Sequence, residues 1–136
     1  MQIKTTSRVL DIPAAPPGEA NAYFAAKLAC ETDPSDVYAD MREGVEGFTL
    51  LDVRSPLAYA EKHASGALSL PHQRIDAETM ADWDRDQTYI VYCWGPGCNG
   101  ADKAAFKLSA LGFSVKTMIG GIEYWEREGC PLETSR

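Results

Sequence analysis

Two cysteines flank a turn-rich segment in the stretch YIVYCWGPGCNGA (89–101). Cys93 ends an apolar run that is typical of a buried strand, and Cys98 follows it on the far side of a glycine- and proline-rich turn. An ordinary strand-to-helix connection needs about two to six residues and no thiol. A cysteine at a strand end is a candidate nucleophile, because the thiolate is the reactive form of its side chain.

The segment between these thiols could form a cradle for a negatively charged sulfur. Glycines at 95, 97 and 100 would permit positive φ angles, so that amide N–H groups turn inward around the sulfur of Cys93. A helix expected to start near Ala101 adds positive potential, and both effects lower the pKa of the thiol below its ordinary value of about 8.5. The alternative is a buried structural cysteine beside glycines that serve only the turn.

Cys98 could belong to a redox pair or to a metal site. It could resolve a sulfenic acid or persulfide on Cys93, or it could point away, since disulfide geometry is strict. A zinc site would need His63 and His72 as well. The histidines lie on other segments and the cysteine spacing is long, so we expect no metal.

A phosphatase cradle of the form Cys-x5-Arg is a third alternative. Counting from Cys93, the arginine would stand at position 99, where the sequence has Asn99. A phosphate dianion would lose its main bidentate partner there, which argues against this activity.

Composition limits what else the chain can be. Its 136 residues, 45% hydrophobic and 24% charged, suit one globular domain. No apolar run approaches the roughly 18 residues of a membrane span, and the N-terminus has no apolar signal segment, so we expect a cytoplasmic protein. The net charge of −7 argues against a nucleic-acid partner and leaves any anionic substrate to local groups.

Strand and helix patterns alternate along the chain, with short connections. Strands are expected at 48–54, 67–70, 88–93 and 113–121, and helices at 16–31, 34–43, 56–62, 73–85, 101–111 and 122–129, after an arm or edge strand at 1–15. This order predicts an α/β fold, a parallel sheet flanked by helices on both faces, with an extra N-terminal helix. Cys93 then lies at the carboxyl edge of the sheet, where such folds bind ligands.

Other noteworthy residues receive structural interpretations. Ile75, Met80, Trp83, Ile122 and Trp125 are expected in the core, Cys30 and Cys130 in packing, His63 and His72 in structural hydrogen bonds, and Glu123, Glu126 and Glu128 on a solvated face. Trp94 is a candidate pocket wall. The helix at 16–31 carries an apolar stripe that could shield a sheet face or form a homodimer contact.

Three segments, taken together, resemble the rhodanese-like sulfurtransferase domain. They are LLDVRSPLAYAEKHASGALSLPH (50–72), YIVYCWGPGCNGADKAAFKLSALGF (89–113) and MIGGIEYWEREGCPL (118–132), in the family's order. The resemblance covers 33–132 and leaves 1–32 as an N-terminal arm with an added helix packed on the domain.

The resemblance implies a sulfurtransferase that needs no cofactor. Cys93 matches the nucleophile that takes sulfane sulfur from a thiosulfate- or polysulfide-like donor and passes it, as a persulfide, to a thiol or other nucleophile. The matching substrate-binding positions are Trp94, Gly95, Pro96, Gly97, Cys98, Asn99 and Gly100, with Asp52 and Arg54 expected to brace the loop or border the pocket.

The cysteine loop departs from the family pattern in three respects. It is about two residues longer, judged by where the helix pattern resumes, it lacks Arg and Lys, and it adds Cys98. The missing cation argues against thiosulfate, a dianion, as the natural donor. A redox pair or a non-catalytic docking module stays open as an alternative, and a docking module would tolerate the loss of Cys93.

Overall fold

The computed structural model describes residues 6–135, arranged around a five-stranded sheet in the order β1-β6-β5-β2-β4. The strands are β1 (Glu31–Thr32), β2 (Phe48–Asp52), β4 (Leu68–Ser69), β5 (Thr88–Tyr92) and β6 (Ser114–Met118). Every neighbouring pair is parallel. A separate antiparallel pair joins β3 (His63–Ala64) to β7 (Leu132–Glu133).

Strand β5 is central, because β2 pairs with one of its edges and β6 with the other. Val91 is paired with Leu51 on β2 and with Thr117 on β6. Both Leu51 and Val91 are fully buried, as expected of a strand covered on both faces. Cys93 follows this strand directly and therefore lies at the middle of the sheet's carboxyl edge.

Helices cover both faces of the sheet, which confirms the predicted α/β architecture. The helices of the described chain are α1 (Pro17–Cys30), α2 (Pro34–Arg42), α3 (Pro56–Glu61), α4 (Gly100–Ala110) and α5 (Gly121–Arg127), with a 3₁₀ turn η1 (His72–Arg74). Leu108 of α4 packs in one hydrophobic cluster with Leu51. Trp125 of α5 and Val37 of α2 belong to the cluster on the other face. Each such side chain contributes about 1.5–3 kcal/mol by burial.

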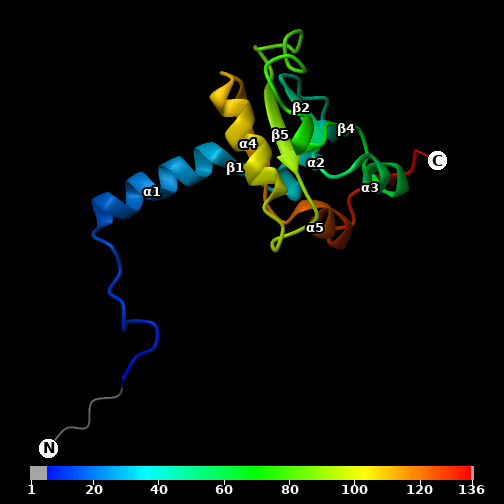
Figure 1. Ribbon diagram of the computed structural model, residues 1–136. Coiled ribbons are helices and arrows are strands. Elements are labelled where there is room, and N and C mark those ends of the chain that lie inside the picture. The colour runs from blue at the N-terminus through cyan, green and yellow to red at the C-terminus, as the bar shows by residue number, and fades with distance from the viewer. Residues whose placement is uncertain (1–5, 136) are drawn as a thin grey trace, which may run out of the picture.

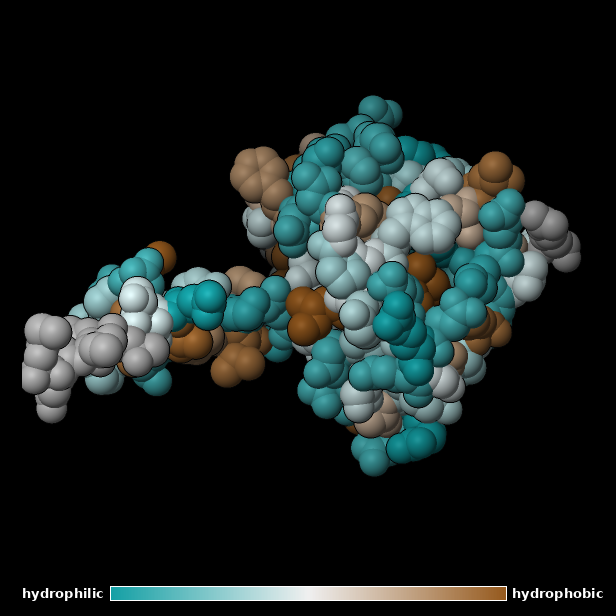
Figure 2. Space-filling model, turned by 90° about the horizontal axis from the view of Figure 1, so that it is seen from below, coloured by the Kyte–Doolittle hydropathy of each residue, from teal (hydrophilic) through white to brown (hydrophobic). Residues whose placement is uncertain are grey.

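Helix α1 projects from the domain as an arm (Figure 1) and buries none of its residues. The expectation that it packs on the domain is wrong. Its last residue leads straight into β1, and Glu31 is extended with φ −131°, so no turn folds the helix back. Tyr23, Phe24 and Leu28 are 61%, 53% and 73% exposed. Figure 2 shows hydrophobic groups on the surface of this arm.

The segment 73–85, expected to be a helix, consists of η1 and a series of turns. Local hydrogen bonds explain the difference, since Asp76 accepts from the amide of Thr79 and Asp84 from that of Asp86. Short acidic side chains of this kind compete with helical backbone bonding. Ile75 and Met80 are nonetheless buried and Trp83 packs beside them, as expected.

The expectations for two cysteines and for the N-terminal segment have different outcomes. Cys130 is buried as expected, whereas Cys30 is exposed on α1, so its assignment to packing is wrong. Residues 6–15 contain no strand, and positions 1–5 of the expected N-terminal arm lie outside the described residues. Among the helices described, none is long and apolar enough to cross a membrane.

Candidate active site

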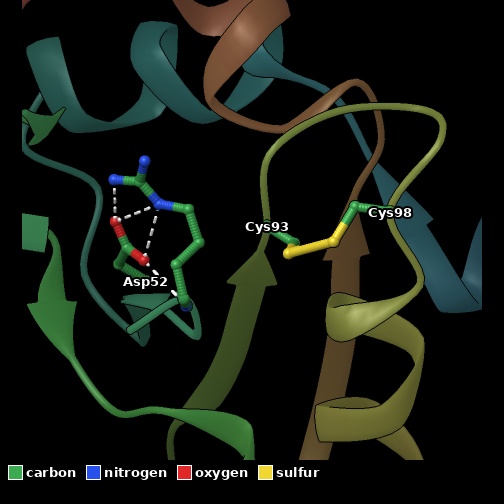
Figure 3. Close-up of a disulfide and its surroundings, with 4 residues drawn as sticks. Asp52, Cys93 and Cys98 are labelled. Atoms are coloured by element: carbon green, nitrogen blue, oxygen red, sulfur yellow. Dashed lines mark hydrogen bonds and ion pairs between the residues drawn. A yellow bond between two sulfur atoms is a disulfide. The ribbon is translucent and has the colours of Figure 1, made fainter. Parts of the chain in front are cut away.

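Cys93 and Cys98 meet at the carboxyl end of β5, where they form a disulfide with their Cα atoms 6.4 Å apart. Figure 3 shows Cys93 at the end of the strand and Cys98 at the far side of an arching loop, just before α4. A hydrogen bond of 3.0 Å from the Cys98 amide to the Gly95 carbonyl closes the turn around Pro96. The loop therefore curls back toward the strand end, as the sequence predicted.

The first part of the loop rests on the start of α5. The amides of Ile122 and Glu123 donate to the carbonyls of Cys93 and Trp94, each at 3.0 Å. Gly121 allows this approach, because a Cβ atom there would lie 2.5 Å from the Cys93 oxygen, and its φ is +61°. The first residue of α5 thus serves to position the Cys93 backbone.

The three loop glycines act differently from the sequence prediction. None of Gly95, Gly97 and Gly100 has a positive φ, so the expected left-handed conformations are absent from this loop. Gly100 is required for space, since a Cβ atom there would lie 2.7 Å from Cys93 Sγ. Gly97 faces open space, and a Cβ on Gly95 would make an ordinary 3.4 Å contact with Glu123.

The sulfur of Cys93 lies against the amino end of α4, as the contact with Gly100 requires. The positive end of the helix dipole stabilises negative charge at that place. Within residues 94–99, only the Cys98 amide donates to a backbone acceptor, so those of Trp94, Gly95, Gly97 and Asn99 stay available. Such surroundings favour the thiolate of a reduced cysteine.

Asp52 and Arg54 form a buried ion pair at the end of β2. The Arg54 Nη2 to Asp52 Oδ2 distance is 2.6 Å, and Nε of Arg54 lies 3.0 and 3.1 Å from the two carboxylate oxygens. Arg54 also donates to the carbonyl of Lys62, and the Tyr92 hydroxyl donates to Asp52 at 2.7 Å. Burial and the Asp52 charge raise the pKa of Tyr92 above its usual range.

This ion pair reaches the loop through one aromatic contact. The guanidinium carbon of Arg54 lies 4.4 Å from the centre of the Trp94 ring. Neither Asp52 nor Arg54 lines the cavities beside the loop. In Figure 3, Asp52 accordingly lies to one side of the disulfide. Of the two expected roles, this geometry fits bracing the loop rather than bordering the pocket.

Two cavities adjoin the loop. One, of about 610 Å³, is lined by Cys93, Gly95, Pro96 and Cys98. The other, of about 530 Å³, is lined by Trp94, Gly95, Pro96, Gly97 and Cys98. Asn99 and Gly100 line neither. Trp94 is 52% exposed and forms a wall of the second cavity, as expected.

The cavity next to Cys93 is predominantly acidic, which the sequence did not reveal. Its charged lining residues are Lys27, Glu31, Asp33, Asp102 and Glu128. The Lys27 ammonium is 2.6 Å from Glu31, so the lone cation of this lining is already paired. Lys27 lies in α1, Glu31 in β1 and Asp102 in α4, while Asp33 and Glu128 flank α2 and α5. No local sequence pattern connects them. The charge of this cavity is therefore set by tertiary contacts.

The two histidines differ. His63 is buried, lies 2.8 Å from the Tyr59 carbonyl through Nδ1 and stacks on that ring, which fits its expected structural role. The buried Nδ1 of His72 has no hydrogen-bond partner, contrary to expectation. Burial first, then the charges of Lys107 and Lys103, hold the pKa of His72 below its usual value. No cluster of metal-ligating residues occurs in 6–135.

A parallel sheet with a cysteine loop held between the starts of two helices defines a rhodanese-like domain. The model of the rhodanese-like domain family matches residues 33–128, and the chain belongs to this family. Three relatives are each named thiosulfate sulfurtransferase GlpE. The protein of Actinobacillus succinogenes is 37% identical, and the match covers 66% of this chain and 79% of the relative. The protein of Pseudomonas entomophila is 36% identical, and the match covers 67% of this chain and 81% of the relative. The protein of Haemophilus influenzae is 30% identical, and the match covers 77% of this chain and 95% of the relative. These names agree with the enzyme class expected from the sequence.

Solved structures share the domain and part of the arm. The BH2092 protein from Bacillus halodurans is 44% identical, with a TM-score of 0.84 over 88% of each chain. A full-length protein from Lactobacillus plantarum is 26% identical, with a TM-score of 0.76 over 88% of this chain and 99% of its own. A match over 88% of the chain is longer than the domain that begins at residue 33, so both include part of α1.

Proposed function

We propose that the protein is a sulfurtransferase that carries sulfane sulfur as a persulfide on Cys93. The thiolate attacks the outer sulfur of a donor and the donor's S–S bond breaks, so that sulfite leaves when the donor is thiosulfate. A thiol or other nucleophile then takes the outer sulfur and returns Cys93 to the thiolate. The observation that carries the proposal is the position of Cys93 Sγ against the start of α4, at the carboxyl end of β5.

The surrounding residues have distinct roles in this proposal. The available amides of Trp94, Gly95, Gly97 and Asn99 stabilise the charge on the outer sulfur. Arg54, fixed by Asp52, holds Trp94 in place. The reduced dithiol is the active form, because a disulfide-bonded Cys93 cannot attack a donor. This fits the proposed cytoplasmic location, where thiols are kept reduced.

The acidic charge of the cavity beside Cys93 affects which sulfur donor loads it. Thiosulfate carries two negative charges, and neither the loop nor the cavity beside Cys93 offers it an unpaired cation. Polysulfides and persulfides of small thiols can approach Cys93 as monoanions, which these carboxylates repel less than a dianion. We therefore propose that they load Cys93 faster than thiosulfate does, and that the acceptor is likewise a thiol.

Intact-protein mass spectrometry tests the carrier. Reduced protein is incubated with thiosulfate or with inorganic polysulfide, in the Cys98→Ser background so that only one loop thiol is present. We expect a gain of one sulfur atom that disappears when Cys93→Ser is added. Cys30→Ser, which removes an exposed thiol on α1, should leave the gain unchanged. Loading that survives Cys93→Ser, or no loading while Cys93 still reacts with an alkylating agent, contradicts the proposal.

A further inference from the structure

The fold brings Cys98 to the sulfur of Cys93 without rearrangement of the sheet or of the helices on either side. The two residues are bonded while β5 is fully paired and α4 has begun. The loop between them is held by two hydrogen bonds to α5 and by its own turn at Gly95. Cys98 is thus a built-in partner of Cys93.

Both cysteines line the cavity of about 610 Å³, so a donor that reaches Cys93 also lies beside Cys98. In the disulfide, Cys98 Sγ takes the bonding position at Cys93 Sγ that the outer sulfur takes in a persulfide. The two sulfurs cannot occupy that position together. A persulfide on Cys93 therefore has a free thiol beside it, five residues further along the same loop.

Resting on the proposed function, we propose that Cys98 resolves the Cys93 persulfide and releases sulfide. Cys98 Sγ attacks Cys93 Sγ, the disulfide bond forms, and the S–S bond of the persulfide breaks. The outer sulfur leaves as HS⁻ with the proton of the Cys98 thiol, so that atoms and charge balance. The sulfane sulfur gains two electrons and the two cysteines lose them. The protein is then a sulfane-sulfur reductase as well as a sulfur carrier.

A dithiol reductant closes the cycle by thiol–disulfide exchange. Cys93 is buried, whereas Cys98 is partly exposed, so the reductant attacks Cys98 Sγ. Cys93 then departs as the thiolate, which the start of α4 stabilises, and a leaving thiol of low pKa departs faster. Resolution competes well with transfer to an external acceptor, because an intramolecular thiol needs no second collision.

A single-turnover experiment without added reductant tests the inference, since a free dithiol would itself release sulfide from a persulfide. Reduced protein, freed of reductant under nitrogen, receives one equivalent of inorganic polysulfide or thiosulfate. Released sulfide is trapped and the chain is weighed. We expect the wild type to release about one sulfide for each sulfur it accepts and to end two hydrogens lighter. Cys98→Ser should keep the extra sulfur and lose sulfide release, and Cys30→Ser should behave as the wild type.

The outcomes separate this inference from the proposed function. A wild type that retains its sulfur, or a Cys98→Ser variant that releases sulfide as fast as the wild type, overturns the inference alone. A persulfide found on Cys98 by peptide mapping also overturns it, because the outer sulfur was then attacked. If neither chain ever accepts sulfur, the carrier proposal fails and takes the inference with it. Cys98→Ala provides the same comparison should the serine variant not fold.

Discussion

The start of α4 lies against the nucleophile candidate, since a Cβ atom on Gly100 would be 2.7 Å from Cys93 Sγ and 3.4 Å from Cys93 Cβ. The backbone of Cys93 is kept from moving away from α4, because its carbonyl accepts a hydrogen bond from the amide of Ile122. Gly100 is therefore the residue that lets the helix dipole act on the sulfur at contact distance.

Gly100→Ala should displace the sulfur from the helix. Alanine favours helices over glycine by at most about 1 kcal/mol, whereas overpacking costs about 1–3 kcal/mol, so the variant should be less stable. We expect slower alkylation of reduced Cys93 as well. Gly97→Ala is the matched control, since its Cβ would meet no atom within 4 Å. Equal alkylation rates in the two variants would contradict this role of Gly100.

The buried pair of Asp52 and Arg54 should matter far more for stability than an exposed pair. Asp52→Ala leaves the Arg54 guanidinium without its carboxylate, and such a loss costs about 3–5 kcal/mol. Lys62 and Glu126 form a 2.7 Å pair whose side chains are about half exposed, and Lys62→Ala should cost no more than about 1 kcal/mol. Urea unfolding measures both. Similar losses of unfolding free energy in Asp52→Ala and Lys62→Ala would show that the buried pair is not the brace described above.

The acidic cavity predicts a charge-dependent donor preference. Asp102 is exposed in the first turn of α4 and lines the cavity that contains Cys93. Asp102→Asn should speed loading from thiosulfate several-fold at low ionic strength, and added salt should shrink the gain, because it screens exposed charges. Asp82→Asn removes an exposed charge that lines neither loop cavity and should change nothing. A gain that is independent of salt would exclude the electrostatic cause.

His72 should make stability depend on pH. Its pKa is lowered by burial and by Lys107 and Lys103, so the folded chain binds this proton less readily than the unfolded chain does. Stability from this site is complete above about pH 6.5, the unfolded value, and is lost as the pH falls below it. The urea midpoint should therefore drop between about pH 7 and pH 5.5, and by less in His72→Asn. If the urea midpoint fell equally with pH in the wild type and in His72→Asn, His72 would not be the cause of the fall.

The sequence predicted the centre of the site better than its surroundings. Hydrophobic continuity identified β5, and the turn-rich segment correctly placed Cys93 and Cys98 at its carboxyl end. The predicted positive φ angles of the loop glycines were wrong. Gly100 is needed for close contact, which depends on where α4 begins relative to the sulfur of Cys93. Local patterns do not contain such distances.

Two further differences have local and non-local causes. The burial of Ile75 and Met80 was predicted, but the expected helix around them is absent, because the Asp76 carboxylate accepts a hydrogen bond from the amide of Thr79 and favours turns. The apolar stripe of α1 predicted a packed helix, although nothing between Cys30 and β1 can reverse the chain. The acidic cavity lies beyond sequence reasoning for a third reason, since its charged residues come from α1, β1, α4 and the positions that flank α2 and α5.

The exposed arm leads to a last prediction. A lone helix of 14 residues is marginal in water, and α1 exposes Phe24 and Leu28 while α4 exposes 76% of Phe106. A cavity of about 580 Å³ lies between α1 and α4 and includes Tyr23 and Phe106. A two-fold axis would place each arm over this groove of the other copy and cover both surfaces at once. We propose that a second copy of the chain is the occupant.

Sedimentation velocity over a range of concentrations checks this proposal. The wild type should sediment as a dimer, and a variant carrying Phe24→Glu and Leu28→Glu as a monomer, because two charges in an apolar interface are costly to desolvate. Both side chains are exposed within one chain, so circular dichroism should show an unchanged fold. Leu57→Glu introduces the same charge at a 70% exposed leucine on α3 and should stay dimeric. A wild type that is monomeric at every concentration would leave α1 without a copy of this chain as its partner, and the proposal would fail.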